Sequence, residues 1–163
     1  MKPKVYVEIS VLSYLTARPH SDIVVAGHQQ VTRDWWQSAA DDFELVASEL
    51  VVQEASAGDR HAAQLRLQAL ETVELLELKE SAVDVAQKLI KSGAIPEIAV
   101  EDALHVAICA VNGVEYLVTW NCRHIANAVK RGLIESVCRS AGLEPPIICT
   151  PDELAGSYGG NLD

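Results

Sequence analysis

Residues 101–127, EDALHVAICAVNGVEYLVTWNCRHIAN, hold the pattern that decides the fold: an apolar helix, a stop signal and a short β-rich run. Apolar side chains recur at helical spacing, at positions 100, 103, 104, 107, 108 and 111. Gly113 is placed to end this helix, because glycine adopts the left-handed conformation that follows many helix C-termini. Apolar residues on both sides of the helix predict that it is buried. A strand is expected directly after it, at 116–119.

The rest of the chain alternates short apolar runs with longer segments of helical period, which is typical of an α/β fold with a parallel sheet. Strands are expected at 4–7, 43–47, 116–119 and 146–149, and 73–78 is ambiguous. Helices are expected at 22–38, after Asp59, around 82–90 and at 100–111. No linker or repeat divides the chain. The sequence therefore predicts a single domain over 1–155 and a flexible C-terminal tail over 156–163.

Composition narrows the classes of function. The 163 residues include 13 Lys and Arg against 23 Asp and Glu, for a net charge of −10. This balance argues against non-specific duplex binding, which needs many cationic contacts to phosphates, but not against nucleic-acid chemistry at an acid-held metal ion. The four cysteines form no CxxC pair, so a zinc ribbon or thioredoxin-like site is not expected. Without a signal peptide or membrane-spanning run, the expected location is the cytoplasm.

Charge is unevenly distributed along the chain. Residues 41–84 hold eleven acids and three bases, whereas 123–139 hold four bases and one acid. Ordinary solvated helix faces would explain both segments. Alternatively, the basic segment forms a cationic rim beside an acidic centre.

Two glutamates occupy positions that call for an explanation. Glu8 ends the apolar run KVYVE, and ligands of open α/β sheets bind beyond the carboxyl ends of the strands. Glu54 lies in an apolar stripe of the short helix that Ser48 can cap, where a carboxylate must be paired, hydrogen-bonded or bound to a metal. Each could instead be a surface residue, Glu8 at a strand edge and Glu54 with its carboxylate extended to solvent.

Three further polar residues surround the decisive stretch. Asp102, in the first turn of the buried helix, either complements the helix dipole or points into a cleft as a ligand. His105, one turn later, is expected to be a hydrogen-bonded core residue. Asn121 either caps the basic helix that follows or supplies a neutral oxygen ligand. The three carboxylates and this amide form an oxygen-only set, which favours Mg²⁺ or Mn²⁺ over zinc and suits phosphodiester hydrolysis.

At these residues the chain resembles the PIN-domain family, and in particular the VapC-like toxins of bacterial toxin–antitoxin pairs. The segment VYVEISVLSYLTARP is similar to the family's first strand and helix, SELVVQEAS to its second acidic segment, and 101–127 to its third-acid helix and next strand. The resemblance covers roughly residues 4–153. It implies a PIN-like three-layer fold, a small, mainly parallel sheet flanked by helices, and a Mg²⁺- or Mn²⁺-dependent endonuclease of single-stranded RNA. It also implies a homodimer and neutralisation by a small antitoxin.

The resemblance gives the acids specific roles. Glu8 and Asp102 would ligate the ion, Glu54 would ligate it or position the attacking water, and Asn121 would complete the shell. Repulsion between the acids would raise at least one carboxyl pKa in the metal-free protein. Glu8 stands where the family usually has Asp, and Asn121 where it often has Asp. These departures favour the alternative, a catalytically weak or inactive PIN-like module that binds RNA or protein.

Other residues are expected to meet partners. Arg123 and Lys130 are candidates for holding the RNA backbone beside the cleft. The acidic charge predicts an antitoxin with a basic arm whose Arg or Lys side chain reaches the acids, since a guanidinium can bridge two carboxylates. Trp35 and Trp36 either anchor that partner or a dimer contact, or pack in the core, with Trp35 on an apolar stripe that begins at Val24.

Overall fold

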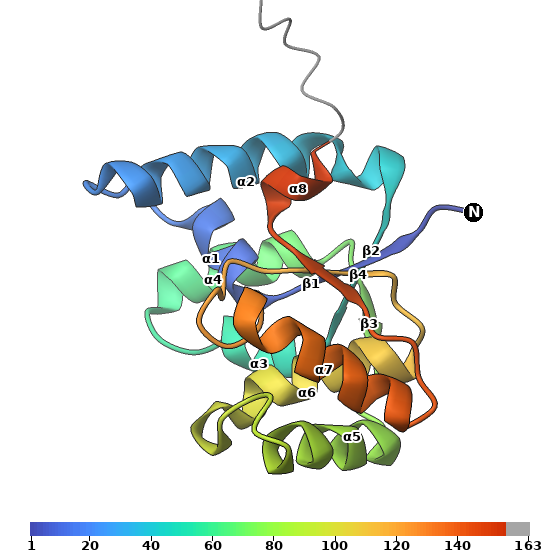
Figure 1. Ribbon diagram of the computed structural model, residues 1–163. Helices are drawn as coiled ribbons and strands as arrows, with labels where there is room; N and C mark the ends of the chain where they lie inside the picture. Colours follow the sequence, from blue (N-terminus) through green and yellow to red (C-terminus); the bar gives the residue numbers. More distant parts are fainter. Residues whose placement is uncertain (156–163) are drawn as a thin grey trace, which may run out of the picture.

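The computed structural model describes residues 1–155 and shows one sheet between two layers of helices (Figure 1). The tail predicted over 156–163 lies outside the described residues. The five strands are β1 (Lys4–Val7), β2 (Glu44–Ser48), β3 (Glu74–Leu76), β4 (Tyr116–Val118) and β5 (Ile147–Cys149). All neighbouring pairs are parallel, and the order is β3-β2-β1-β4-β5, which places β1 at the centre. The predicted α/β class with a parallel sheet is confirmed, and the ambiguous segment 73–78 contains the edge strand β3.

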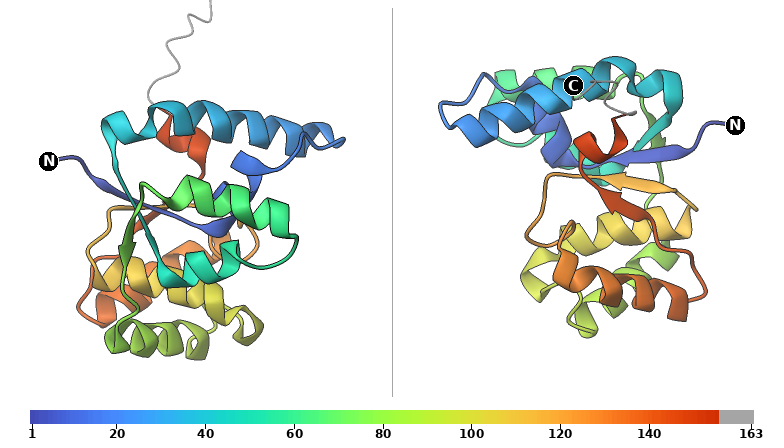
Figure 2. Two further views of the ribbon diagram at one scale, coloured as in Figure 1. Left: turned by 180° about the vertical axis from the view of Figure 1, so that it is seen from behind. Right: turned by 45° about the horizontal axis from the view of Figure 1, so that its top comes forward.

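Helices cover both faces of this sheet (Figure 2). They are α1 (Ile9–Thr16), α2 (Ile23–Asp42), α3 (Glu49–Ala55), α4 (Arg60–Leu70), α5 (Glu80–Lys91), α6 (Val100–Val111), α7 (Ala128–Ser140) and α8 (Pro151–Leu154). One layer contains α1, α2 and α8, and α5, α6 and α7 form the opposite layer. Because both faces are covered, the central strand is apolar and Val5, Tyr6 and Val7 are fully buried. No helix within residues 1–155 is long and apolar enough to cross a membrane.

The helix starts follow from capping side chains. Asp22 accepts hydrogen bonds from the backbone nitrogens of Val24 and Val25, and Asp59 caps α4 in the same manner. Ser48 caps α3. These caps satisfy backbone donors that have no partner inside the helix. Gly113 follows α6 with φ of +64°, as the stop signal predicted.

Two features of α2 differ from the prediction. The helix continues to Asp42 rather than ending near Ser38. Its apolar stripe does not begin at Val24, which is 61% exposed, because the first turns of α2 extend past the sheet (Figure 1). Trp35 is buried in the core, and Trp36 packs against that core with its ring edge-on to Trp35.

The start of α7 and the short helix α8 were not predicted from the sequence. Asn121 does not cap the basic helix: α7 starts after Asn127, whose side chain accepts from the first backbone nitrogens. The intervening loop buries Ile125 before the helix begins. The short helix α8 was not expected, although Pro151 in its first turn and a capping box between Thr150 and Glu153 mark its start.

Candidate functional site

The candidate site lies at the edge of the sheet where the parallel strands end. Glu8 directly follows β1, Thr119 directly follows β4, and Ser48 is the last residue of β2. Glu54 and Asp102 reach the same region from α3 and α6. Crossover connections between parallel strands bring these polar side chains together, as ligand sites of open α/β sheets require.

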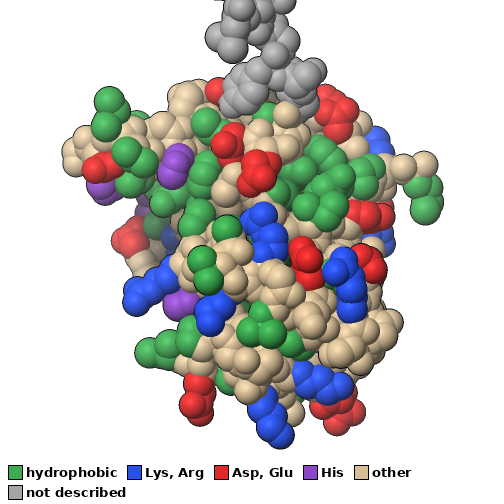
Figure 3. Space-filling view, viewed as in Figure 1, with side chains coloured by type: hydrophobic (Ala, Val, Ile, Leu, Met, Phe, Trp, Pro, Cys, Tyr) green, Lys and Arg blue, Asp and Glu red, His purple; other side chains and the backbone are tan. Residues whose placement is uncertain are grey.

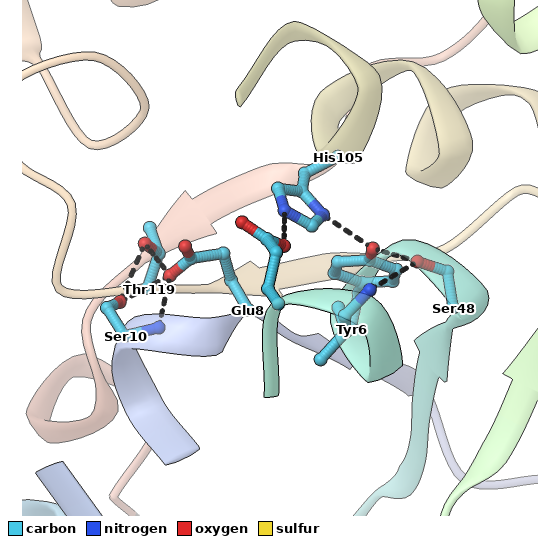
Figure 4. A network of polar contacts seen from close by, with 8 residues as sticks. Tyr6, Glu8, Ser10, Ser48, His105 and Thr119 are labelled. Carbon is cyan, nitrogen blue, oxygen red and sulfur yellow. Dashed lines mark hydrogen bonds and ion pairs between the residues drawn. The ribbon is translucent and has the colours of Figure 1, made fainter. Parts of the chain in front are cut away.

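Glu8 is a buried carboxylate with a full set of donors on one oxygen. It is 2% exposed, and its Oε2 accepts from the Ser10 backbone nitrogen at 2.9 Å, from the Thr119 hydroxyl at 2.8 Å and from the Ser10 hydroxyl. In Figure 4 the carboxylate faces Ser10 and Thr119. Burial raises the pKa of Glu8, and the nearby His105 and the hydrogen bonds lower it. Glu8 therefore caps α1 and ties that helix to the end of β4.

A second group of polar side chains forms a continuous chain of hydrogen bonds. The Tyr6 hydroxyl lies 2.7 Å from Ser48 Oγ and 2.7 Å from His105 Nδ1 (Figure 4). The other ring nitrogen of His105, Nε2, lies 2.6 Å from Oε1 of Glu54. His105 and Tyr6 are completely buried, whereas the Glu54 side chain is 25% exposed. The expectation that His105 is a hydrogen-bonded core residue is confirmed.

Asp102 occupies the half-buried start of α6, and Asn121, three residues beyond β4, approaches it. Burial raises the pKa of the Asp102 carboxyl, and the negative charge of Glu54 raises it further. The Asn121 side chain and the nearby histidines act in the opposite direction on this pKa. The predicted rise of an acid pKa is therefore present for Glu8 and Asp102, but burial rather than mutual repulsion is its main cause. Asn121 also accepts a hydrogen bond from the His124 backbone nitrogen at 3.0 Å.

Glu54 and Asp102 share an open cleft of about 470 Å³. Its other lining residues are Ile98, Ala99, Glu101, Arg123 and His124. Glu8, which is buried, and Asn121 do not line this cleft. The structure thus places two of the four predicted site residues on the cleft surface, with Asn121 in contact with one of them and Glu8 buried near His105.

A cationic hollow adjoins the acidic cleft. Arg123 and His124 line both, and the smaller hollow of about 170 Å³ also contains Asn127 and Lys130. The Lys130 ammonium donates to the Gly93 carbonyl at 3.1 Å. Basic side chains gather on and around α7 on the face seen in Figure 3. Arg123 and Lys130 therefore stand where a rim beside the acids was predicted.

The cleft offers two carboxylates, from Glu54 and Asp102, to a hard divalent cation. Within the described residues, no group of three or more His, Cys, Asp or Glu side chains is arranged to hold a metal ion. Magnesium in proteins is usually bound through one or two carboxylates, and waters and substrate phosphates complete its shell. Glu54 and Asp102 supply two carboxylates at one cleft, and hydrogen bonds orient such ligands in metal sites.

Sequence reasoning missed the residues that hold the acids in place. Tyr6, Ser10 and Thr119 were not singled out, yet they contact His105 or Glu8. The signal for Tyr6 was available, because a tyrosine inside a buried strand needs a partner for its hydroxyl. Ser10 and Thr119 carry no such signal, since small hydroxyl residues at strand ends are common.

The fold is that of a PIN domain of the VapC type, as comparison with solved structures shows. One match is VapBC2 from Rickettsia felis, whose structure was solved bound to a DNA fragment from its promoter. The TM-score is 0.58, with 14% identity over 90% of this chain and 98% of that one. VapC20 from Mycobacterium tuberculosis, a toxin that cleaves the sarcin–ricin loop, matches with a TM-score of 0.57 and 13% identity over 76% of this chain and 95% of that one. At these identities the likeness concerns the fold alone. Neither a protein-family model nor a curated protein sequence matches this chain.

Proposed function

We propose that this protein is a metal-dependent endoribonuclease of the toxin–antitoxin type that hydrolyses phosphodiester bonds in single-stranded RNA. One observation carries the proposal: Glu54 and Asp102 line one cleft at the carboxyl edge of a VapC-like sheet, and Arg123 and Lys130 line a cationic hollow next to it. A cleft that offers carboxylates to a cation and a rim that offers cations to phosphates suits a phosphodiester substrate. The solved neighbours include a toxin that cleaves the sarcin–ricin loop.

Each residue has a specific task in this proposal. Asp102 and Glu54 would hold a Mg²⁺ or Mn²⁺ ion, Asn121 would support Asp102, and Glu8 would add to the negative potential nearby. When bound there, such an ion would supply polarisation of the phosphate and hydroxide at neutral pH. Arg123 lies at the junction of the acidic and cationic hollows, so it is placed to fix the phosphate next to the scissile bond. The ionised acids also attract the ion, and burial makes this attraction stronger than it would be in water.

The partners follow from charge and from the fold. We propose an antitoxin whose basic arm places an Arg or Lys side chain over Glu54 and Asp102, where it competes with the metal ion. Glu8, which was expected to meet that side chain, is buried and would contribute only to the local negative potential. The Rickettsia felis neighbour is a toxin–antitoxin complex, which supports this kind of partner. A homodimer in the cytoplasm completes the proposal.

The test is cleavage of an end-labelled single-stranded RNA by protein freed of metal with a chelator and then supplied with Mn²⁺. We expect cleavage only after Mn²⁺ is added, and loss of at least about a hundredfold in rate for Asp102→Asn and Glu54→Gln, since removing a metal ligand costs several kcal/mol of transition-state stabilisation. Glu49→Gln is the matched control, because Glu49 is an exposed acid on α3, five residues before Glu54. Cleavage that survives the chelator, or equal rates in all variants, would reject the proposal.

The alternative is a PIN-like module that binds RNA or protein without cleaving it. The burial of Glu8 favours this alternative, because its donors already satisfy one carboxylate oxygen and it does not line the cleft. Calorimetric titration with Mn²⁺ separates the two functions. A nuclease should show one saturable site per chain that Asp102→Asn removes, whereas a binding module should show none.

A further inference from the structure

We infer that Tyr6 and Ser48 are positioning residues: through His105 they hold the Glu54 carboxylate in the orientation that faces the cleft. The inference rests on the proposed function, in which Glu54 is one of the two acids that hold the ion. It assigns a task to three buried polar side chains, Tyr6, Ser48 and His105, that the chemistry of the cleft itself does not use.

The Glu54 end of the hydrogen-bond chain sets its direction. The Val51 backbone nitrogen, 3.4 Å from Ser48 Oγ, can only donate, and the ionised Glu54 carboxylate can only accept. The two hydroxyls and the imidazole can each donate or accept, so the direction is assigned from the Glu54 end, with a neutral imidazole: Nε2 donates to Glu54, Tyr6 donates to Nδ1 of His105, and Ser48 donates to the Tyr6 oxygen. With Nδ1 accepting, the hydrogen of the neutral imidazole must sit on Nε2, which faces Glu54.

The chain begins and ends on the same short helix. Ser48 caps α3, and Glu54 lies in the last turn of that helix, while Tyr6 belongs to β1 and His105 to α6. The hydrogen bonds therefore fasten α3 to the central strand and to the helix that carries Asp102. This arrangement sets the position of Glu54 relative to Asp102, the other acid of the cleft.

The hydroxyl of Tyr6 indicates that the buried hydrogen-bond chain has a task beyond packing. A phenylalanine would fill the same fully buried position on β1 without placing a polar atom in the core. Burying a hydroxyl is unfavourable unless it is hydrogen-bonded, and here it makes two bonds of 2.7 Å. Groups that orient metal-binding side chains from behind typically change metal affinity or activity 10- to 100-fold when they are removed.

The experiment compares Tyr6→Phe with Tyr116→Phe. Tyr116 is half-buried on the adjacent strand β4, and its hydroxyl takes no part in the chain, so it controls for loss of a phenol oxygen from the same sheet. In Tyr6→Phe, Nδ1 loses its donor and the imidazole can place its hydrogen on the wrong nitrogen. We expect Mn²⁺ affinity, measured by calorimetry, to fall about tenfold in Tyr6→Phe and to stay unchanged in Tyr116→Phe.

Two further readouts separate positioning from mere support of the fold. The ¹⁵N spectrum of the His105 ring should show hydrogen on Nε2 in the native protein and a mixture of tautomers in Tyr6→Phe. His105→Gln should recover most of the Mn²⁺ affinity lost in His105→Leu, because a glutamine amide can accept from Tyr6 and donate to Glu54.

The inference is overturned if Tyr6→Phe binds Mn²⁺ like the native protein, if native His105 carries its hydrogen on Nδ1 alone, or if His105→Gln and His105→Leu are equally impaired. Failure of the proposed function looks different. A native protein with no saturable Mn²⁺ binding rejects the metal site itself, and in that case the ¹⁵N spectrum still decides whether the hydrogen-bond chain has the stated direction.

Discussion

Replacing Glu8 with alanine should destabilise the fold much more than replacing it with glutamine. Alanine leaves the Ser10 nitrogen, the Ser10 hydroxyl and the Thr119 hydroxyl without their acceptor in a site that is 2% exposed. A buried donor that loses its partner costs about 1–3 kcal/mol, so the three together cost at least about 3 kcal/mol. For a domain of this size the melting temperature should fall by about 6–12 °C.

Glutamine should behave in the opposite way at neutral pH. Its amide oxygen can replace the carboxylate oxygen that accepts all three hydrogen bonds, and it removes the buried charge. Burial raises the pKa of Glu8, so the folded protein binds this proton more tightly than the unfolded chain does. The stabilising effect of that proton is complete below the unfolded pKa and is lost as the pH rises through the folded pKa. The stability of Glu8→Gln relative to the native protein should therefore increase from about pH 4 towards neutral pH.

Urea unfolding in the presence of a chelator, followed by circular dichroism at several pH values, measures both effects. Glu101→Gln serves as the control, since Glu101 is an exposed acid at the start of α6 and should leave stability nearly unchanged. The reasoning is refuted if Glu8→Ala and Glu8→Gln are equally stable at neutral pH. It is also refuted if Glu8→Gln shows the same dependence on pH as the native protein.

Three further predictions follow from the same site. Mn²⁺ at a hundred times its Kd should stabilise the native protein by about 2.7 kcal/mol, which is a shift of about 5–11 °C in thermal unfolding. It should leave the stability of Asp102→Asn unchanged, and an equal shift in both proteins would place the ion elsewhere. Because the charge of Glu54 helps burial raise the pKa of Asp102, Glu54→Gln should lower that pKa in a carbon-detected NMR titration without metal, and an upward or absent shift would contradict the proximity of the two acids. Arg123→Ala and Lys130→Ala should each weaken RNA binding and reduce the salt slope by about one, whereas Arg139→Ala, at the far end of α7, should not; equal slopes in all three would mean that the RNA lies elsewhere.

The sequence predicts this fold well because its local signals agree with the packing. The apolar spacing of 100–111, the stop at Gly113 and the helix starts at Ser48 and Asp59 all correspond to observed elements. The prediction for Val24 failed because helical periodicity says which side of a helix is apolar, but not how far the helix extends beyond the core. Of the two alternatives for Asn121, capping of the basic helix is excluded, because α7 begins only after Asn127, which caps it.

The site was predictable in part, for a different reason. Parallel strands bring their carboxyl ends to one edge, so strand-end acids such as Glu8 can be placed from sequence alone. How deeply each acid is buried at that edge cannot be predicted in this way, because burial depends on side-chain contacts between distant segments. Glu8 is buried by its contacts with Ser10 and Thr119, while Glu54 and Asp102 reach the surface. The contact between His105 and Tyr6 could not be predicted either, since the two residues lie 99 positions apart in the chain.

The most direct test of the metal-dependent nuclease is a Mn²⁺ titration read in two ways on the same preparation, by the heat of binding and by the rate of cleavage of a single-stranded RNA. The account predicts one saturable site per chain, whose Kd coincides with the midpoint of activation, and loss of both in Asp102→Asn. Cleavage that reaches its full rate without Mn²⁺ binding, or a saturable site that leaves the RNA intact, would contradict it.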